Sequence, residues 1–149
     1  MRKKIRFFVV LITFLLLSLF FKIELDNFIM STIYTVSSIM FSIGIGLVVS
    51  FNLYGIKNKS FVKIIRSNLN EVRNSYILYF AISTICYIAD RYLREKHISA
   101  EFRISDNTQI DFCLSFFFLL VILYSMVYYI SNFLALQKLN NDIFDTLNN

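Results

Sequence analysis

The apolar stretch from Phe28 to Leu53, FIMSTIYTVSSIMFSIGIGLVVSFNL, decides the fold of this chain. A helix needs about 20 consecutive apolar residues to cross the roughly 30 Å hydrocarbon layer of a bilayer, and this stretch exceeds that length. Three other apolar runs accompany it, namely 7–21, 76–89 and 112–136. The four runs take up more than half of the 149 residues. The sequence therefore predicts an integral membrane protein.

The composition supports an all-α membrane domain. The chain is 57% hydrophobic, contains 17 Phe and no Pro, and has a mean hydropathy of +0.62. Contiguous apolar runs leave no polar face for water, whereas a soluble amphipathic helix alternates at a period of 3.6 residues. We expect one transmembrane four-helix bundle over residues 1–149. Its helices are predicted at about 5–22, 28–54, 60–96 (74–92 in the membrane) and 109–136, with a tail at 137–149.

The first run follows several basic residues, as in a signal peptide, but no small-x-small cleavage site follows it at Phe21–Lys22. We expect it to remain attached as the first helix, with Arg6 and Lys22 extending toward the two membrane surfaces.

Basic residues fall unevenly on the two sides of the predicted membrane. Ten of the 15 lie on one side, and they are Arg2, Lys3, Lys4, Arg6, Lys57, Lys59, Lys63, Arg66, Arg73 and Lys138. Basic residues gather on the cytoplasmic side of membrane proteins. The sequence therefore predicts that both termini are cytoplasmic.

The membrane surfaces should be marked by tyrosines and acids. Without tryptophan, tyrosine is the expected interfacial anchor, with Tyr54, Tyr76, Tyr128 and Tyr129 at inner ends and Tyr92 at an outer end. Seven acids fall on the outer side and would form a negative rim around any central axis, favouring cations. They are Glu24, Asp26, Asp90, Glu95, Glu101, Asp106 and Asp111.

The third run is too short to span alone and must be extended. Apolar residues recur at Phe61, Ile65, Leu69 and Val72, which predicts an amphipathic cytoplasmic helix continuous with the run. Ser60 should cap this helix. On the outer side, Thr108-x-x-Asp111 resembles a capping box for the fourth helix.

A polar stripe on the second helix has the most functional promise. We call the set Ser31, Thr35, Ser38, Ser42 and Gly46 the hydroxyl stripe; its spacings of 4, 3, 4 and 4 place it on one face roughly 80° wide. Such residues either let another helix approach closely or line a wet path. Both roles are compatible when copies of one helix surround an axis. A conducting lumen would require several subunits, so we expect a homo-oligomer.

The basic segment made up of Lys57, Lys59, Lys63, Arg66 and Arg73 has three interpretations. In the first, these basic residues only set the orientation of the chain in the membrane and attract anionic lipid. In the second they bind a phosphate-bearing ligand, and in the third they bind an acidic protein. In the second case the amides of Asn68, Asn70 and Asn74 could read a base edge.

Nothing in the sequence points to catalysis, so we expect a protein that is not an enzyme and has no metal and no cofactor. His97, the single histidine, sits among outer-loop charges, and no nucleophile–base or metal-ligand spacing is visible. Cys86 and Cys113 fall on the same predicted side and are either bridged or buried as thiols.

Three stretches, 35–52, 56–59 and 73–75 (TVSSIMFSIGIGLVVSFN, IKNK and RNS), carry a resemblance. They resemble small bacterial membrane effectors of nucleotide-signalled anti-phage defence, in particular the channel subunit of Hailong-type systems. The resemblance implies a homo-oligomeric, multi-pass ion channel of the bacterial inner membrane. It also implies control by a cyclic nucleotide or oligonucleotide that a partner nucleotidyltransferase makes.

Two functions therefore remain open. In one, the chain is a pore-forming effector that responds to a cytoplasmic nucleotide signal and depolarises the membrane. In the other, it is a membrane adaptor or immunity protein that binds another membrane protein through the hydroxyl stripe and does not conduct.

Overall fold

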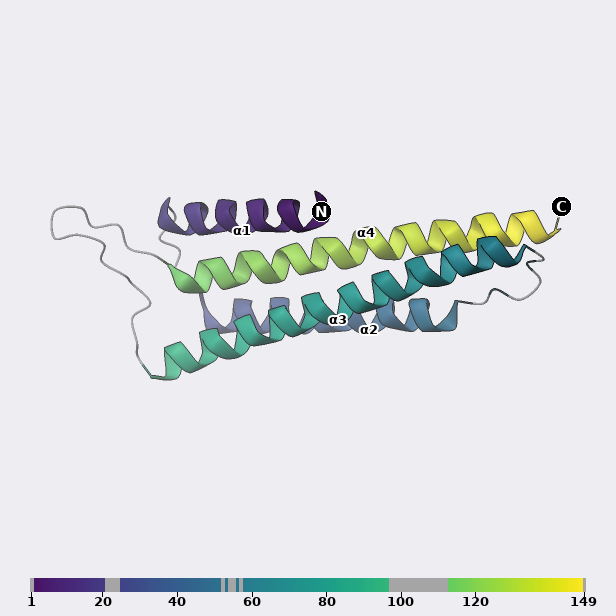
Figure 1. Ribbon diagram of the computed structural model, residues 1–149. Coiled ribbons are helices and arrows are strands. Elements are labelled where there is room, and N and C mark those ends of the chain that lie inside the picture. Colours follow the sequence, from purple (N-terminus) through teal and green to yellow (C-terminus); the bar gives the residue numbers. More distant parts are fainter. Residues whose placement is uncertain are drawn as a thin grey trace. The chain divides into compact units, whose positions relative to one another are not determined.

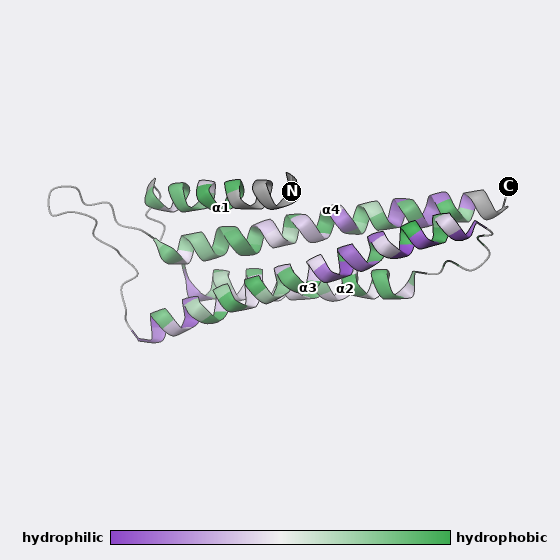
Figure 2. Cartoon of the chain, in the orientation of Figure 1, coloured by the Kyte–Doolittle hydropathy of each residue, from purple (hydrophilic) through white to green (hydrophobic). Residues whose placement is uncertain are grey.

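The computed structural model describes residues 2–20, 25–51, 53, 56, 58–96 and 113–148 (Figure 1). Over these residues the chain is all-α, as predicted, and forms four helices in the order α1 (Arg2–Phe20), α2 (Asn27–Ser50), α3 (Lys59–Glu95) and α4 (Leu114–Asn148). Two of them, α2 and α4, are long and apolar enough to cross a membrane, and α1 holds a shorter apolar stretch, Val9–Leu19. In Figure 2, hydrophobic residues dominate α2 and the first half of α4, and hydrophilic residues gather in the first half of α3.

The contacts divide the chain into two compact units. The first comprises Met1–Thr35 and Ile82–Tyr124, and the second comprises Val36–Ala81 and Ser125–Asn149. Because the boundaries fall inside helices, α2, α3 and α4 each contribute residues to both units.

The core of the first unit is an apolar cluster to which all four helices contribute residues. Its buried members are Leu25, Met30, Cys86, Leu119, Val121 and Ile122. The rings of Tyr34 and Tyr87 stack beside it with centroids 4.3 Å apart. The Cys113 backbone N–H donates a 3.2 Å hydrogen bond to the Ser18 carbonyl, which ties the start of α4 to the last turn of α1.

The second unit combines an aliphatic cluster with an aromatic one. The buried aliphatic residues are Val48, Ile65, Leu69, Leu136 and Ile143. In the aromatic cluster, Tyr76 stacks on Tyr129 with ring centroids 5.0 Å apart, and the Tyr76 hydroxyl donates a 2.9 Å hydrogen bond to the Tyr129 carbonyl.

Tyr76 and Tyr129 correct an expectation from the sequence. They are only 0% and 1% exposed, so they are core residues of the second unit and the prediction of interfacial anchors is wrong for both. The Tyr76 ring packs directly against the backbone of α2 at Gly44. Only glycine fits there, because an added Cβ would overlap Tyr76 Cε1. Tyr92 is 56% exposed, and Tyr54 lies outside the described residues.

The cap of α3 also differs from the prediction. Asn58 Oδ1 accepts hydrogen bonds from the backbone N–H groups of Ser60 and Phe61, at 3.1 and 3.2 Å. Asn58 therefore caps the helix, and Ser60 does not, because the helix begins one residue earlier than expected and an asparagine stands ahead of it. The Thr108–Asp111 box lies outside the described residues.

Two helices end at other residues than predicted, because apolar side chains near their ends pack into the second core. The fourth helix continues to Asn148, beyond the predicted end at 136, since Leu136, Leu139 and Ile143 recur at helical spacing and pack into the second core. Conversely, α2 ends at Ser50 and not at 54. Phe51 and Leu53 pack against the same core from the segment that follows the helix.

Candidate functional site

The hydroxyl stripe lies on a face of α2 that the described residues leave largely open. Thr35, Ser42 and Gly46 are exposed, and Ser31 and Ser38 are half-buried. The helix packs through a different face, whose buried residues are Met30, Ser37, Gly44 and Val48. The stripe is rotated roughly 100–180° from Ser37 around the helix axis.

Three hydroxyls of the stripe bond to carbonyls of their own helix. Ser31 donates to the Phe28 carbonyl at 3.0 Å, Thr35 to Ser31 at 2.8 Å and Ser42 to Ser38 at 3.0 Å. A Cβ added to Gly46 would meet nothing within 4 Å among the described atoms. Among the described residues, these three hydroxyls therefore bond within α2, and Gly46 leaves open space beside the helix.

Other small residues fill that packing role, and the sequence analysis missed them. One serine from each described helix has 0% exposure, and the four are Ser18, Ser37, Ser83 and Ser125. Ser37 and Ser38 are neighbours in sequence but about 100° apart around α2, so one is buried and the other belongs to the stripe. In the sequence, the seven-residue spacing of Met30, Ser37 and Gly44 could have indicated this buried face of α2.

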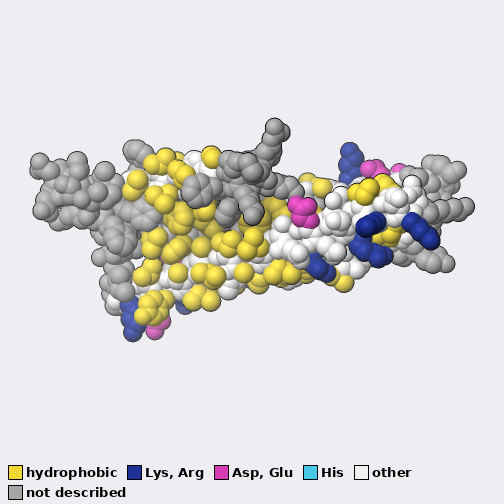
Figure 3. Space-filling model, in the orientation of Figure 1, with side chains coloured by type: hydrophobic (Ala, Val, Ile, Leu, Met, Phe, Trp, Pro, Cys, Tyr) yellow, Lys and Arg dark blue, Asp and Glu magenta, His cyan; other side chains and the backbone are white. Residues whose placement is uncertain are grey.

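Four of the five residues of the basic segment fall on α3, and Lys57 lies outside the described residues. Lys59, Lys63, Arg66 and Arg73 are all exposed. With Asn70 they recur at spacings of 4, 3, 4 and 3, so they form one face roughly 80° wide. We call these five residues the basic face. Lys and Arg side chains are visible over the first turns of α3 in Figure 3.

The apolar residues beneath the basic face behave largely as predicted. Ile65 and Leu69 are 4% and 9% exposed, and Val72 packs beside them in the second core. Phe61 departs from the pattern, since 45% of it is exposed. The amphipathic character of this part of α3 therefore presents its bases outward.

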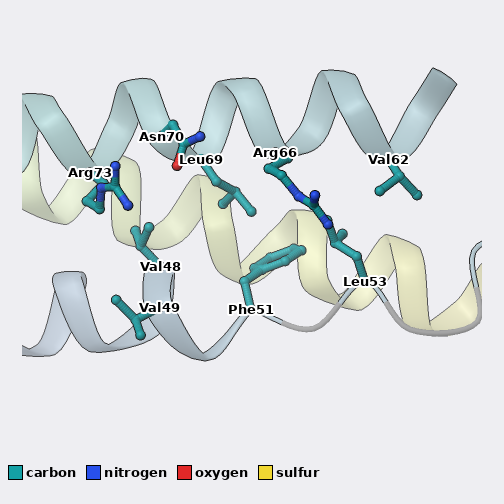
Figure 4. Close-up of a pocket in the computed structure, with 9 residues that line it drawn as sticks. All are labelled: Val48, Val49, Phe51, Leu53, Val62, Arg66, Leu69, Asn70 and Arg73. Atoms are coloured by element: carbon teal, nitrogen blue, oxygen red, sulfur yellow. The ribbon is translucent and has the colours of Figure 1, made fainter. Parts of the chain in front are cut away.

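A cavity of about 590 Å³ opens beside the basic face within the second unit. Arg66, Asn70 and Arg73 line it from α3, and Figure 4 shows Leu69 and Asn70 between the two arginines. The other described residues of the lining are apolar and come from the end of α2, the segment after it and α3. They are Val48, Val49, Phe51, Leu53, Val62 and Leu69.

An ion pair in the first unit was also missed by the sequence analysis. Asp90 is only 1% exposed, and Arg94 Nε lies 2.8 Å from its Oδ2. Arg94 Nη1 also donates a 2.5 Å hydrogen bond to the Leu25 carbonyl. Among the described residues, Asp90 Oδ1 and Arg94 Nη2 are buried without a hydrogen-bond partner. The signal was the i, i+4 spacing of opposite charges on a helix.

This pair corrects the predicted outer rim of acids. Asp90 is buried and cannot belong to such a rim, because the end of α3 packs inside the first unit. Asp26 and Glu95 are exposed. The other four acids (Glu24, Glu101, Asp106 and Asp111) lie outside the described residues.

The structure describes both thiols but not the histidine. Cys86 and Cys113 are not bridged, and Cys86 is buried in the first core. Among the residues that the structure describes, no group of three or more His, Cys, Asp or Glu could hold a metal ion. His97 lies outside them.

We compared the chain with known proteins. No family model, no curated protein and no solved structure matches it. The features of this chain that bear on function are the hydroxyl stripe, the basic face and the cavity.

Proposed function

We propose that this chain is a multi-pass protein of the bacterial inner membrane whose copies assemble around α2 into an ion-conducting pore. The observation that carries the proposal is the hydroxyl stripe, a polar face on an apolar helix whose Thr35, Ser42 and Gly46 are exposed. We further propose that both termini are cytoplasmic and that the assembly acts without catalysis.

The exposure of apolar side chains supports the membrane location. In the most apolar windows of α2 and α4, only 17% and 28% of residues are buried, whereas the core helix of a soluble protein is mostly buried. Val49, Phe28 and Ile85 are 73%, 72% and 66% exposed. Exposing such side chains to water costs roughly 1.5–3 kcal/mol each, and contiguous exposed apolar surface marks contact with a membrane or a partner.

The small side chains of the stripe support assembly of several copies. Hydroxyl residues and glycine allow close backbone approach between membrane helices, and Gly46 offers open space for a neighbour. Rings of hydroxyls also suit the wall of a water-filled path. In a symmetric assembly around α2, one edge of the stripe would contact the next copy while the other faces the lumen.

The basic face supports control from the cytoplasmic side. Its exposed bases suit a phosphate-bearing signal, and the resemblance to anti-phage effectors suggests a cyclic nucleotide or an oligonucleotide made by a partner nucleotidyltransferase. Such a signal must bind the open and closed states with different affinity to gate the pore. Depolarisation of the membrane would then stop growth of the infected cell.

The decisive experiment measures conductance of the purified full chain in planar bilayers. We expect unitary currents, and we expect Ser42→Leu to lower or abolish them. Thr32→Leu is the matched control, because Thr32 is an exposed hydroxyl residue on α2 that lies outside the stripe, about 80° from Ser42 around the helix axis. A bilayer that stays silent with and without nucleotides would overturn the pore and favour the non-conducting adaptor or immunity protein.

The signal has a separate test. Lys63→Glu with Arg66→Glu should abolish salt-sensitive binding of a labelled oligonucleotide while membrane insertion is unchanged. If the affinity for the oligonucleotide does not change, the side chains of Lys63 and Arg66 do not bind nucleotide.

A further inference from the structure

We propose that the cavity beside the basic face is a binding site for one anionic phospholipid. Its headgroup phosphate would contact Arg66 and Arg73, and its glycerol and upper acyl part would lie on the apolar lining. This inference rests on the proposed membrane location and does not require the chain to conduct.

The polar side of the cavity suits a phosphate. Arg66 and Arg73 lie seven residues apart on one face of α3, which corresponds to about 10.5 Å along the helix axis, and Asn70 lies between them with an amide N–H (Figure 4). Guanidinium groups bind phosphate oxygens in a fork geometry that lysine lacks. Glu71 lies roughly 120° from Lys59 around the helix, so the arginine side of the cavity has no acid on its own face.

The rest of the cavity suits an acyl chain. Six of the nine described lining residues are apolar, and Val49 among them is 73% exposed. Val48 and Val49 belong to the last turn of α2, the end of a helix long enough to span the bilayer. The ends of spanning helices lie at the level of the lipid headgroups, where basic pockets hold anionic ones.

The same lining disfavours a nucleotide base. A base presents several donors and acceptors that cost free energy when buried without partners. Among the described residues that line the cavity, Asn70 is the one uncharged polar side chain. The volume of about 590 Å³ lies within the usual range of ligand sites, so the chemistry of the lining selects the ligand.

The test titrates the full chain, purified in a neutral detergent at about 0.15 M salt, with phosphatidylglycerol and with phosphatidylcholine of equal chain length. Native mass spectrometry counts the bound lipids. We expect phosphatidylglycerol to bind more tightly, and Arg66→Gln with Arg73→Gln to weaken it about 30-fold.

The matched control is Lys59→Gln with Lys63→Gln, which removes the same charge from the same face outside the cavity. It should weaken binding about twofold or less, since exposed charges beyond about 8 Å are screened at this salt concentration. Val49→Trp keeps both arginines but obstructs the apolar side, and it should also weaken binding. Circular dichroism and gel filtration confirm that each variant is folded.

Three outcomes would overturn the proposal: equal binding of the two lipids, equal loss from both charge pairs, or stronger displacement of the lipid by a short oligodeoxynucleotide than by inorganic phosphate at equal charge. The last would assign the cavity to the nucleotide. Lipid binding is measured without recording current. A negative result for the lipid site is therefore distinguishable from a negative result for the pore.

Discussion

The two ends of α3 differ in whether charged side chains are exposed or buried. Its first turns hold Lys59, Lys63, Arg66 and Arg73 on the surface of the second unit, whereas its last turns bury Asp90 against Arg94 in the first unit. An exposed charge keeps its water and remains available to a ligand, at little cost to stability. The Asp90 carboxylate has lost its water and depends on Arg94, whose side chain is 27% exposed. The contrast separates candidate binding residues from residues that maintain the fold.

Breaking the buried pair should have the largest effect on stability. Arg94→Ala leaves the Asp90 carboxylate buried without its cation, and we expect a loss of about 3–5 kcal/mol in the free energy of unfolding. Denaturant titration in detergent measures it. The double variant Asp90→Leu with Arg94→Met should recover most of the loss, because it leaves no buried charge. A loss for Arg94→Ala below about 1 kcal/mol, the usual value for an exposed pair, would contradict the buried assignment.

The same contrast between a buried and an exposed face exists on α2. Gly44→Ala places a methyl group against the Tyr76 ring and should cost about 1–3 kcal/mol. Gly46→Ala meets open space and should be neutral or stabilise the helix by up to about 1 kcal/mol. Thermal unfolding of the two variants side by side checks this. Equal effects would show that Tyr76 does not pack on Gly44.

The tyrosine cluster gives a smaller effect. Tyr76→Phe keeps the stacked ring but removes the hydrogen bond to the Tyr129 carbonyl, which should cost about 1 kcal/mol. Tyr92→Phe is the control, because this exposed tyrosine should change stability by less than about 0.5 kcal/mol. Urea titration distinguishes them. A neutral Tyr76→Phe would indicate that water replaces the lost bond.

The smallest effect on stability is expected on the basic face. Arg66→Gln should change the free energy of unfolding by less than about 0.5 kcal/mol, while binding of an anionic ligand falls. Chemical unfolding and ligand titration of the same preparation test both halves. A clear loss of stability would mean that Arg66 maintains the fold, as Arg94 does.

Much of the helical framework could be predicted from the sequence. The third helix was expected at 60–96 and spans Lys59–Glu95, because no glycine or proline interrupts it. The apolar spacing of Ile65, Leu69 and Val72 also indicated the buried side of its first half. Such features depend on residues close together in the chain.

The features that were missed depend on contacts between helices far apart in sequence. The burial of Asp90, Tyr76 and Ser37 follows from how each helix is rotated against its neighbours. A single-sequence pattern fixes that rotation only where apolar and polar residues alternate strongly. In α2, almost every position is apolar or small, so hydropathy alone does not separate Ser37 from Ser38. The exposure of the hydroxyl stripe was therefore visible only in the structure.

The hydrogen bonds inside α2 carry one more consequence. Because the hydroxyls of Ser31, Thr35 and Ser42 bond to carbonyls of their own helix, a neighbouring helix could slide along the stripe without breaking a hydrogen bond to these three side chains. Movement of a second copy along this face, in the proposed assembly, would therefore be opposed at these three residues by van der Waals contacts and not by hydrogen bonds.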